Sequence, residues 1–145
     1  MLCTDLRVMA AEARIGLPEI RLGLFPGGGG SQRLMRQLPL CHAKKLMFTG
    51  DQLDASQALA MGLVNEVWPR AELMARATAL AERIAAMSAQ TLKLLKHAML
   101  HGADMPLEQA LAYERAMLSV VLDHPDAAEG CQAFLDKRPP RFADR

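Results

Sequence analysis

"IGLPEIRLGLFPGGGGSQRL", residues 15–34, carries a single carboxylate, Glu19, immediately after a proline and then runs into four consecutive glycines. Short apolar pieces interrupted by glycine and proline are typical of brief strands joined by tight connections. We expect one such strand over 20–25, followed by a helix over 32–38 that is capped by Ser31. Strands and helices in close succession predict an α/β fold for this part of the chain.

Glu19 has two interpretations. Its apolar neighbours would strip water from the carboxylate on folding, which suits proton transfer near neutral pH. Alternatively, Glu19 and Arg21 share the solvent face of a strand whose other face, with Leu22 and Leu24, points inward, and Glu19 is then merely exposed. The glycines favour the first interpretation, because residues 27–30 can adopt positive φ and bring backbone N–H groups close to a ligand, just before a helix. The run lacks the lysine of a P-loop and does not fit G-x-G-x-x-G, so nucleotide binding is unsupported.

The chain divides into two parts near residue 70. Residues 1–69 combine short apolar pieces at 6–8 and 63–67 with helices expected over 41–48 and 55–61, the second capped by Asp54. From residue 70 onward, apolar residues recur at intervals of three or four, which predicts helices throughout. We expect the later helices to begin after Ser88, near Pro106 and at Pro125.

The composition argues against several classes of partner. With 17 basic and 16 acidic side chains among 145 residues, the chain is nearly neutral, so we expect neither nucleic acid nor an anionic membrane as a partner. The sequence shows no apolar run of membrane-spanning length and no leader pattern, which predicts a cytoplasmic protein.

The cysteines and histidines show no disulfide or metal signature. Cys3, Cys41 and Cys131 are odd in number and lack paired spacing, so we interpret them as packing residues. His97 and His101 are four residues apart, as two helical metal ligands would be, but no third ligand is near them in the sequence. We interpret both as surface residues and expect no metal site.

Three motifs together carry a family resemblance. "ARIGLPEIRLGLFPGGGGSQRL", "FTGDQLDASQALAMGLVNEV" and "EGCQAFLDKRPPRF" resemble, in order and spacing, the C-terminal half of an enoyl-CoA hydratase of the crotonase superfamily. The chain departs from the usual pattern at Ser31, where threonine is common, and at Gly28, where alanine is common. The resemblance implies the C-terminal part of the ββα spiral fold, with its catalytic loop, over 1–69, and a helical oligomerisation region over 70–145.

The resemblance also implies a reaction, the reversible hydration of a 2-enoyl-CoA to a 3-hydroxyacyl-CoA in fatty-acid or related acyl-CoA degradation. Glu19 matches the glutamate that protonates the α-carbon, and Gly27 matches the position whose N–H helps to hold the water. Phe134 and Lys137 match positions near the CoA of a neighbouring subunit, although Lys137 also fits a solvated charge at a helix C-terminus. The acyl-CoA is the substrate, no cofactor is implied, and relatives of this kind form trimers or hexamers.

In the family, the second catalytic carboxylate and both oxyanion donors precede the position of residue 1. Because the loss of one oxyanion donor costs a factor of roughly 10² to 10³ in turnover, we expect the isolated chain to have little or no activity. Two alternatives remain open. The chain belongs to an enoyl-CoA isomerase of the same family, although Gly27 favours a hydratase, or it is a non-catalytic association module.

Overall fold

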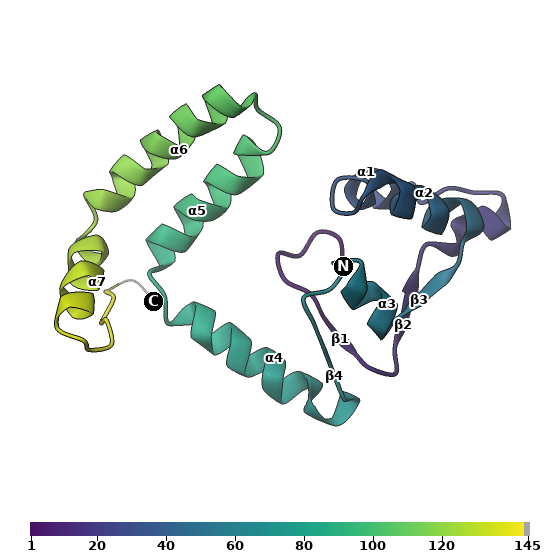
Figure 1. Cartoon of the computed structure of the whole chain (residues 1–145), viewed down its shortest axis with the longest axis horizontal. Helices are drawn as coiled ribbons and strands as arrows, with labels where there is room; N and C mark the ends of the chain where they lie inside the picture. The colour runs from purple at the N-terminus through teal and green to yellow at the C-terminus, as the bar shows by residue number, and fades with distance from the viewer. Residues whose placement is uncertain (144–145) are drawn as a thin grey trace. The chain divides into compact units, whose positions relative to one another are not determined.

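The computed structural model describes residues 1–143, and the chain divides into two compact units, Met1–Thr78 and Ala79–Arg145. Helices outnumber strands, and the strands all lie in the first unit (Figure 1). The α/β class expected from the sequence is confirmed as a mixed, mostly helical fold. The division between the units falls inside helix α4 (Arg70–Ala85), whereas the change to helical sequence begins at the start of that helix.

The first unit is built on two small strand pairs. Strand β1 (Val8–Ala10) pairs in parallel with β4 (Glu66–Trp68), with Met9 opposite Val67. Strand β2 (Arg14–Gly16) pairs antiparallel with β3 (Gln52–Asp54), with Ile15 opposite Leu53. These pairings join segments that are about 40 to 60 residues apart in sequence, so the register follows from tertiary contacts and not from hairpin turns.

Helices fill the sequence between these strands. They are the 3₁₀ helix η1 (Pro18–Leu22) and the α-helices α1 (Gly30–Leu34), α2 (Leu40–Thr49) and α3 (Ala55–Ala60). The cap predicted at Asp54 is confirmed. Asp54 forms a capping box with Gln57 at the start of α3, and Gly50 ends α2 in the left-handed conformation, with φ of 65°.

Three local predictions in the opening stretch are wrong. The segment expected as a strand over 20–25 begins instead as η1, because Pro18 fixes the first turn and Gly23, with φ of 70°, ends it. Leu22 is 78% exposed, so the pattern in which Leu22 and Leu24 point inward is also wrong. The cap expected at Ser31 is wrong by two residues, since α1 starts at Gly30 and Gly29 occupies the N-cap without a side-chain bond.

The core of the first unit gathers residues from every layer of that unit. Met9 from β1, Leu53 from β3 and Leu46 from α2 are buried together. The other buried members are Leu34, Leu38, Ala43, Ala55, Ala58, Leu63 and Val64. Trp68, the single tryptophan, is also buried, at the end of β4. This core fixes α2 and β3 on either side of the segment that carries Glu19.

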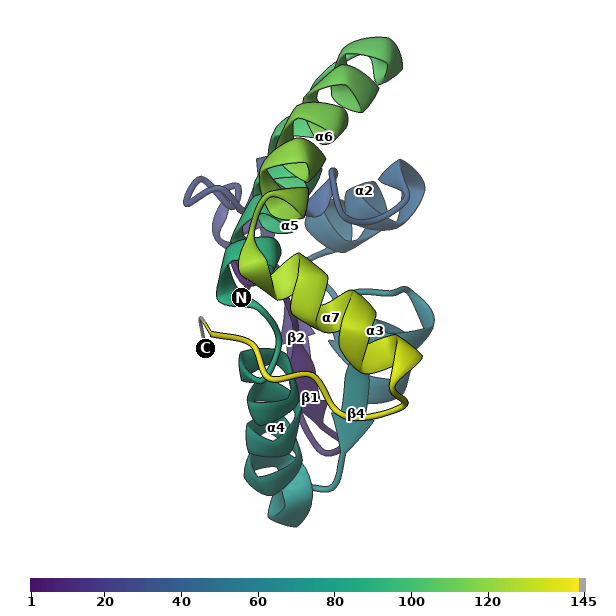
Figure 2. The same ribbon diagram turned by 90° about the vertical axis from the view of Figure 1, so that its left-hand side faces the viewer.

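The second unit is helical, as expected. It contains α5 (Ala89–Gly102), α6 (Leu107–Leu122) and α7 (Pro125–Leu135), and the Ser88 hydroxyl caps α5 as predicted. Helices α5 and α6 form an antiparallel pair in both views (Figure 1, Figure 2). The ring of Tyr113 on α6 meets the ring of His101 on α5 edge-on, with centroids 6.1 Å apart, so Tyr113 packs between the two helices.

The interpretation of the cysteines as packing residues is wrong, since Cys3, Cys41 and Cys131 are all exposed. Cys41 lies in the first turn of α2 and Cys131 on α7, and in both helices alanines take the deepest positions. Over residues 1–143, no helix is both long enough and apolar enough to cross a lipid bilayer.

Candidate active site

Glu19 lies on η1, a single 3₁₀ turn with no fully buried residue of its own. The turn is held by its contacts with α2 and with the residues that follow it. Gly50, at the end of α2, lies so close to η1 that a Cβ there would be 3.0 Å from Ile20 Cγ2 and 3.1 Å from Arg21 Cγ. Arg21 also pairs with Asp51 across 3.2 Å at the surface. The glycine at the end of α2 therefore sets where η1 can lie.

The Glu19 side chain borders a cleft of about 310 Å³ in the first unit. Apolar side chains from all parts of the unit line it, among them Ile15, Leu17, Leu34, Leu46, Leu53 and Leu63. Glu19 and Arg33 are the charged side chains in the lining. The Oε2 atom of Glu19 is buried and has no hydrogen-bond partner among the described residues. Since burying a polar atom without a partner is unfavourable, this oxygen is placed for a group that enters the cleft.

The glycine turn forms another wall of the same cleft. Gly28, Gly29 and Gly30 line it, while Gly27 is exposed and lies outside the lining. Within residues 1–143, none of the N–H groups of Gly27, Gly28 and Gly29 has a hydrogen-bond acceptor. The positive φ of Gly29, 92°, produces this open turn, as the glycine run predicted. The cleft thus combines one carboxyl oxygen without a partner and several free backbone donors.

Phe134 and Lys137 lie in the second unit, whereas Glu19 and Gly27 lie in the first. Phe134 is 83% exposed near the end of α7. Lys137 adopts positive φ, 54°, directly after the helix. Its N–H donates to the Phe134 carbonyl and the next N–H, of Arg138, donates to the Ala133 carbonyl. This is the Schellman arrangement, in which glycine usually occupies the position of Lys137.

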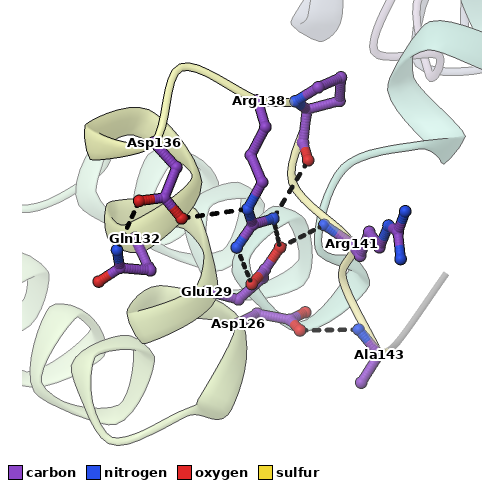
Figure 3. A network of polar contacts seen from close by, with 8 residues as sticks. Asp126, Glu129, Gln132, Asp136, Arg138, Arg141 and Ala143 are labelled. Carbon is purple, nitrogen blue, oxygen red and sulfur yellow. Dashed lines mark hydrogen bonds and ion pairs between the residues drawn. The ribbon is translucent and has the colours of Figure 1, made fainter.

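A polar network anchors the tail after α7 (Figure 3). The three motifs did not predict it. The guanidinium of Arg138 donates two hydrogen bonds, of 2.7 and 2.9 Å, to the carboxylate of Glu129. The same carboxylate accepts the backbone N–H of Arg141 at 2.6 Å, and Asp126 accepts that of Ala143 at 2.8 Å. Arg138 is therefore a structural ion-pair partner and not a freely solvated charge.

The network shifts the acidity of its members. The Arg138 guanidinium, followed by the Arg141 N–H, lowers the pKa of Glu129 to about 2, and the paired carboxylate raises the pKa of Arg138. The sequence signal for this contact is an acid and a base nine residues apart, on either side of the end of α7.

Within the described residues, no three histidine, cysteine, aspartate or glutamate side chains are grouped to hold a metal ion. The rings of His97 and His101 contact each other, with centroids 5.5 Å apart, at the surface of α5.

The sequence profile of the enoyl-CoA hydratase/isomerase family matches residues 1–145. The chain belongs to this family. A protein of Mycobacterium tuberculosis named as a probable enoyl-CoA hydratase is 39% identical over 145 residues, which are 100% of this chain and 56% of that protein. The 2,3-dehydroadipyl-CoA hydratase of Escherichia coli is also 39% identical, with the same coverage of both chains. An enoyl-CoA hydratase structure from Bacillus anthracis matches with a TM-score of 0.95 and 36% identity, over 99% of this chain and 56% of that chain.

The chain thus spans about half the length of the curated relatives that it matches. Its family membership confirms the resemblance drawn from the three motifs. The solved hydratase confirms a crotonase-like fold, while the ββα spiral itself stays a prediction. The roles of Glu19, Gly27, Phe134 and Lys137 also stay predictions. The geometry adds that Glu19 shares its cleft with the glycine turn.

Proposed function

We propose that this chain supplies the proton donor and the water-binding turn of an enoyl-CoA hydratase. The observation that carries the proposal is the buried Oε2 of Glu19, which has no partner and borders the same cleft as the glycine turn. Such an oxygen gains a partner when a substrate or water enters. The apolar walls suit the hydrocarbon part of an acyl group, and the free N–H groups suit a water oxygen.

In this reaction, water adds reversibly across the α,β double bond of a 2-enoyl-CoA to give a 3-hydroxyacyl-CoA. Glu19 gives its proton to the α-carbon while the water oxygen bonds to the β-carbon and loses one proton to a second carboxylate, and the Gly27 N–H helps to hold that water. The resemblance assigns the second carboxylate and the oxyanion donors to positions before residue 1. We therefore expect little or no hydration by the 145-residue chain alone.

In this proposal, the second unit contributes contacts to the CoA that is bound by a neighbouring subunit. The exposed ring of Phe134 packs against the cofactor portion of the substrate, and Lys137 meets a phosphate of the nucleotide. A planar exposed ring and an exposed ammonium suit these two roles. The complete protein works in the cytoplasm as a homotrimer or hexamer in acyl-CoA degradation.

The test is a chimaera in which this chain replaces the matching segment of the Escherichia coli relative. Crotonyl-CoA hydration is followed by the loss of the enoyl thioester absorbance. Replacing a general acid costs roughly 10² to 10⁴ in rate, so we expect a loss of that size in kcat for Glu19→Gln. Glu12→Gln is the matched control, because Glu12 is an exposed glutamate of the same unit. An active chimaera that keeps full activity with glutamine at position 19 would contradict the assignment.

The second candidate, a non-catalytic association module, is favoured by the exposed apolar side chains of α5 and α6. They include Leu95, Met99, Leu100, Leu107, Leu118 and Leu122. This alternative predicts that the chain co-purifies with a full-length relative and that Glu19→Gln changes nothing. An isomerase is distinguished by offering 3-enoyl-CoA to the same chimaera, since a hydratase leaves the position of that double bond unchanged.

A further inference from the structure

The guanidinium of Arg33 contacts the backbone of the glycine turn through its Nη1 atom. Its Nη1 atom occupies the space that a Cβ of Gly29 would fill, and Cζ would be 2.9 Å from such a Cβ. Nη1 also donates a hydrogen bond of 3.3 Å to the Gly28 carbonyl. The backbone N–H of Arg33 donates to the Gly29 carbonyl at 2.9 Å. One residue therefore contacts two consecutive peptide units of the turn.

Gly28 and Gly29 have little else to hold them. An added Cβ at Gly28 would meet nothing within 4 Å, and the N–H groups of both residues have no acceptor within the described residues. Glycine has the largest backbone freedom of any residue, so a run of four needs an external contact to keep one conformation. The Arg33 side chain supplies that contact while lining the same cleft as Glu19.

From this geometry we infer that Arg33 is a positioning residue that holds the glycine turn with its N–H groups free to bind water in the cleft. The inference rests on the proposed hydratase function for its catalytic consequence, but not for the contact itself. The Nη1 atom holds the Gly28 carbonyl and the backbone N–H of Arg33 holds the Gly29 carbonyl, while the N–H groups of both glycines have no acceptor among the described residues. The planar fork of the guanidinium can cover Gly29 and donate at once, which the compact ammonium of lysine cannot do.

The first test measures the turn directly by backbone ¹⁵N relaxation in the 145-residue chain. We expect the order parameters of Gly28 and Gly29 to fall from the rigid range, about 0.85, to below about 0.6 in Arg33→Ala and in Arg33→Lys. Arg36→Ala is the matched control, because among the described residues the hydrogen bonds of the Arg36 guanidinium all go to Gln32. Unchanged order parameters in Arg33→Ala, an equal fall in Arg36→Ala, or a fall that extends to Leu53 in β3 would overturn the inference.

The second test uses the active chimaera. A misplacement of about 1 Å at a reacting group can cost 10²-fold, so we expect kcat to fall by roughly 10- to 100-fold in Arg33→Ala while KM changes little. If the turn loosens and kcat stays the same, the positioning role is refuted. If the parent chimaera does not hydrate enoyl-CoA, the proposed function fails, whereas the relaxation result still decides whether Arg33 holds the turn.

Discussion

Gly50→Ala probes the contact that places the Glu19 turn. Gly50 and Gly62 have nearly the same left-handed conformation, with φ of 65° and 72°. An alanine at either position costs roughly 1–2 kcal/mol in conformational energy. Only Gly50 also faces neighbours, because an added Cβ would lie 3.0 Å from Ile20 and 3.1 Å from Arg21, whereas at Gly62 it would meet nothing within 4 Å.

The contact adds a second cost at Gly50. Overpacking typically costs about 1–3 kcal/mol, and we expect the lower end, because Ile20 and Arg21 are both exposed and can move. Gly50→Ala is therefore expected to destabilise the first unit by about 1 kcal/mol more than Gly62→Ala. For a unit of this size, that difference corresponds to about 4–8 °C in Tm.

Trp68 makes the measurement specific to the first unit, since it is the single tryptophan and is buried there. Thermal unfolding followed by its fluorescence compares the parent chain, Gly50→Ala and Gly62→Ala. The result that would refute the reasoning is an equal Tm for the two variants, because the close packing of η1 on Gly50 would then be absent. If both variants matched the parent, the left-handed conformations themselves would be wrong.

Two further predictions concern the second unit. Lys137→Gly should raise the free energy of unfolding by up to about 1 kcal/mol, because glycine takes the left-handed conformation without the steric penalty of a side chain. Thermal unfolding followed by circular dichroism checks this prediction. A lower Tm in the variant would contradict it. The pKa of Glu129 is lowered to about 2, mainly by Arg138, so its stabilising effect is full above the ordinary value of 4.5 and is lost as pH falls toward 2. The protection factor of the Arg141 amide, which is its exchange rate relative to the unstructured rate at the same pH, should therefore fall over that interval in the parent. In Glu129→Gln it should show no such dependence and should already be low at neutral pH.

Helix boundaries in the C-terminal part were predictable because their signals are local. Ser88 and Pro125 start helices for reasons contained within one turn, and the three-to-four-residue apolar period needs no distant partner. The same holds for Asp54, whose capping box with Gln57 is closed within three residues.

The conformation of residues 15–34 was harder to predict from the sequence, because it depends on residues elsewhere in the chain. An apolar run such as 20–25 becomes a strand only if another strand offers a hydrogen-bond ladder. Here the available neighbour is α2, and Pro18 and Gly23 already favour a tight turn, so η1 forms. The prediction that the cysteines pack in the interior is wrong for a similar reason, since burial is a property of the packed unit and not of the residue type.

By itself, the sequence determined the family, the mixed α/β class, the helical C-terminal part and the position of Glu19 beside a glycine turn. Motif spacing and local periodicity can be recognised without knowledge of distant contacts. Only the tertiary structure decided that Glu19 Oε2 is buried without a partner, that Arg33 covers Gly29, and that Arg138 pairs with Glu129 to anchor the tail. Each of these facts depends on where one segment lies against another, and that placement results from burying the side chains of several segments together.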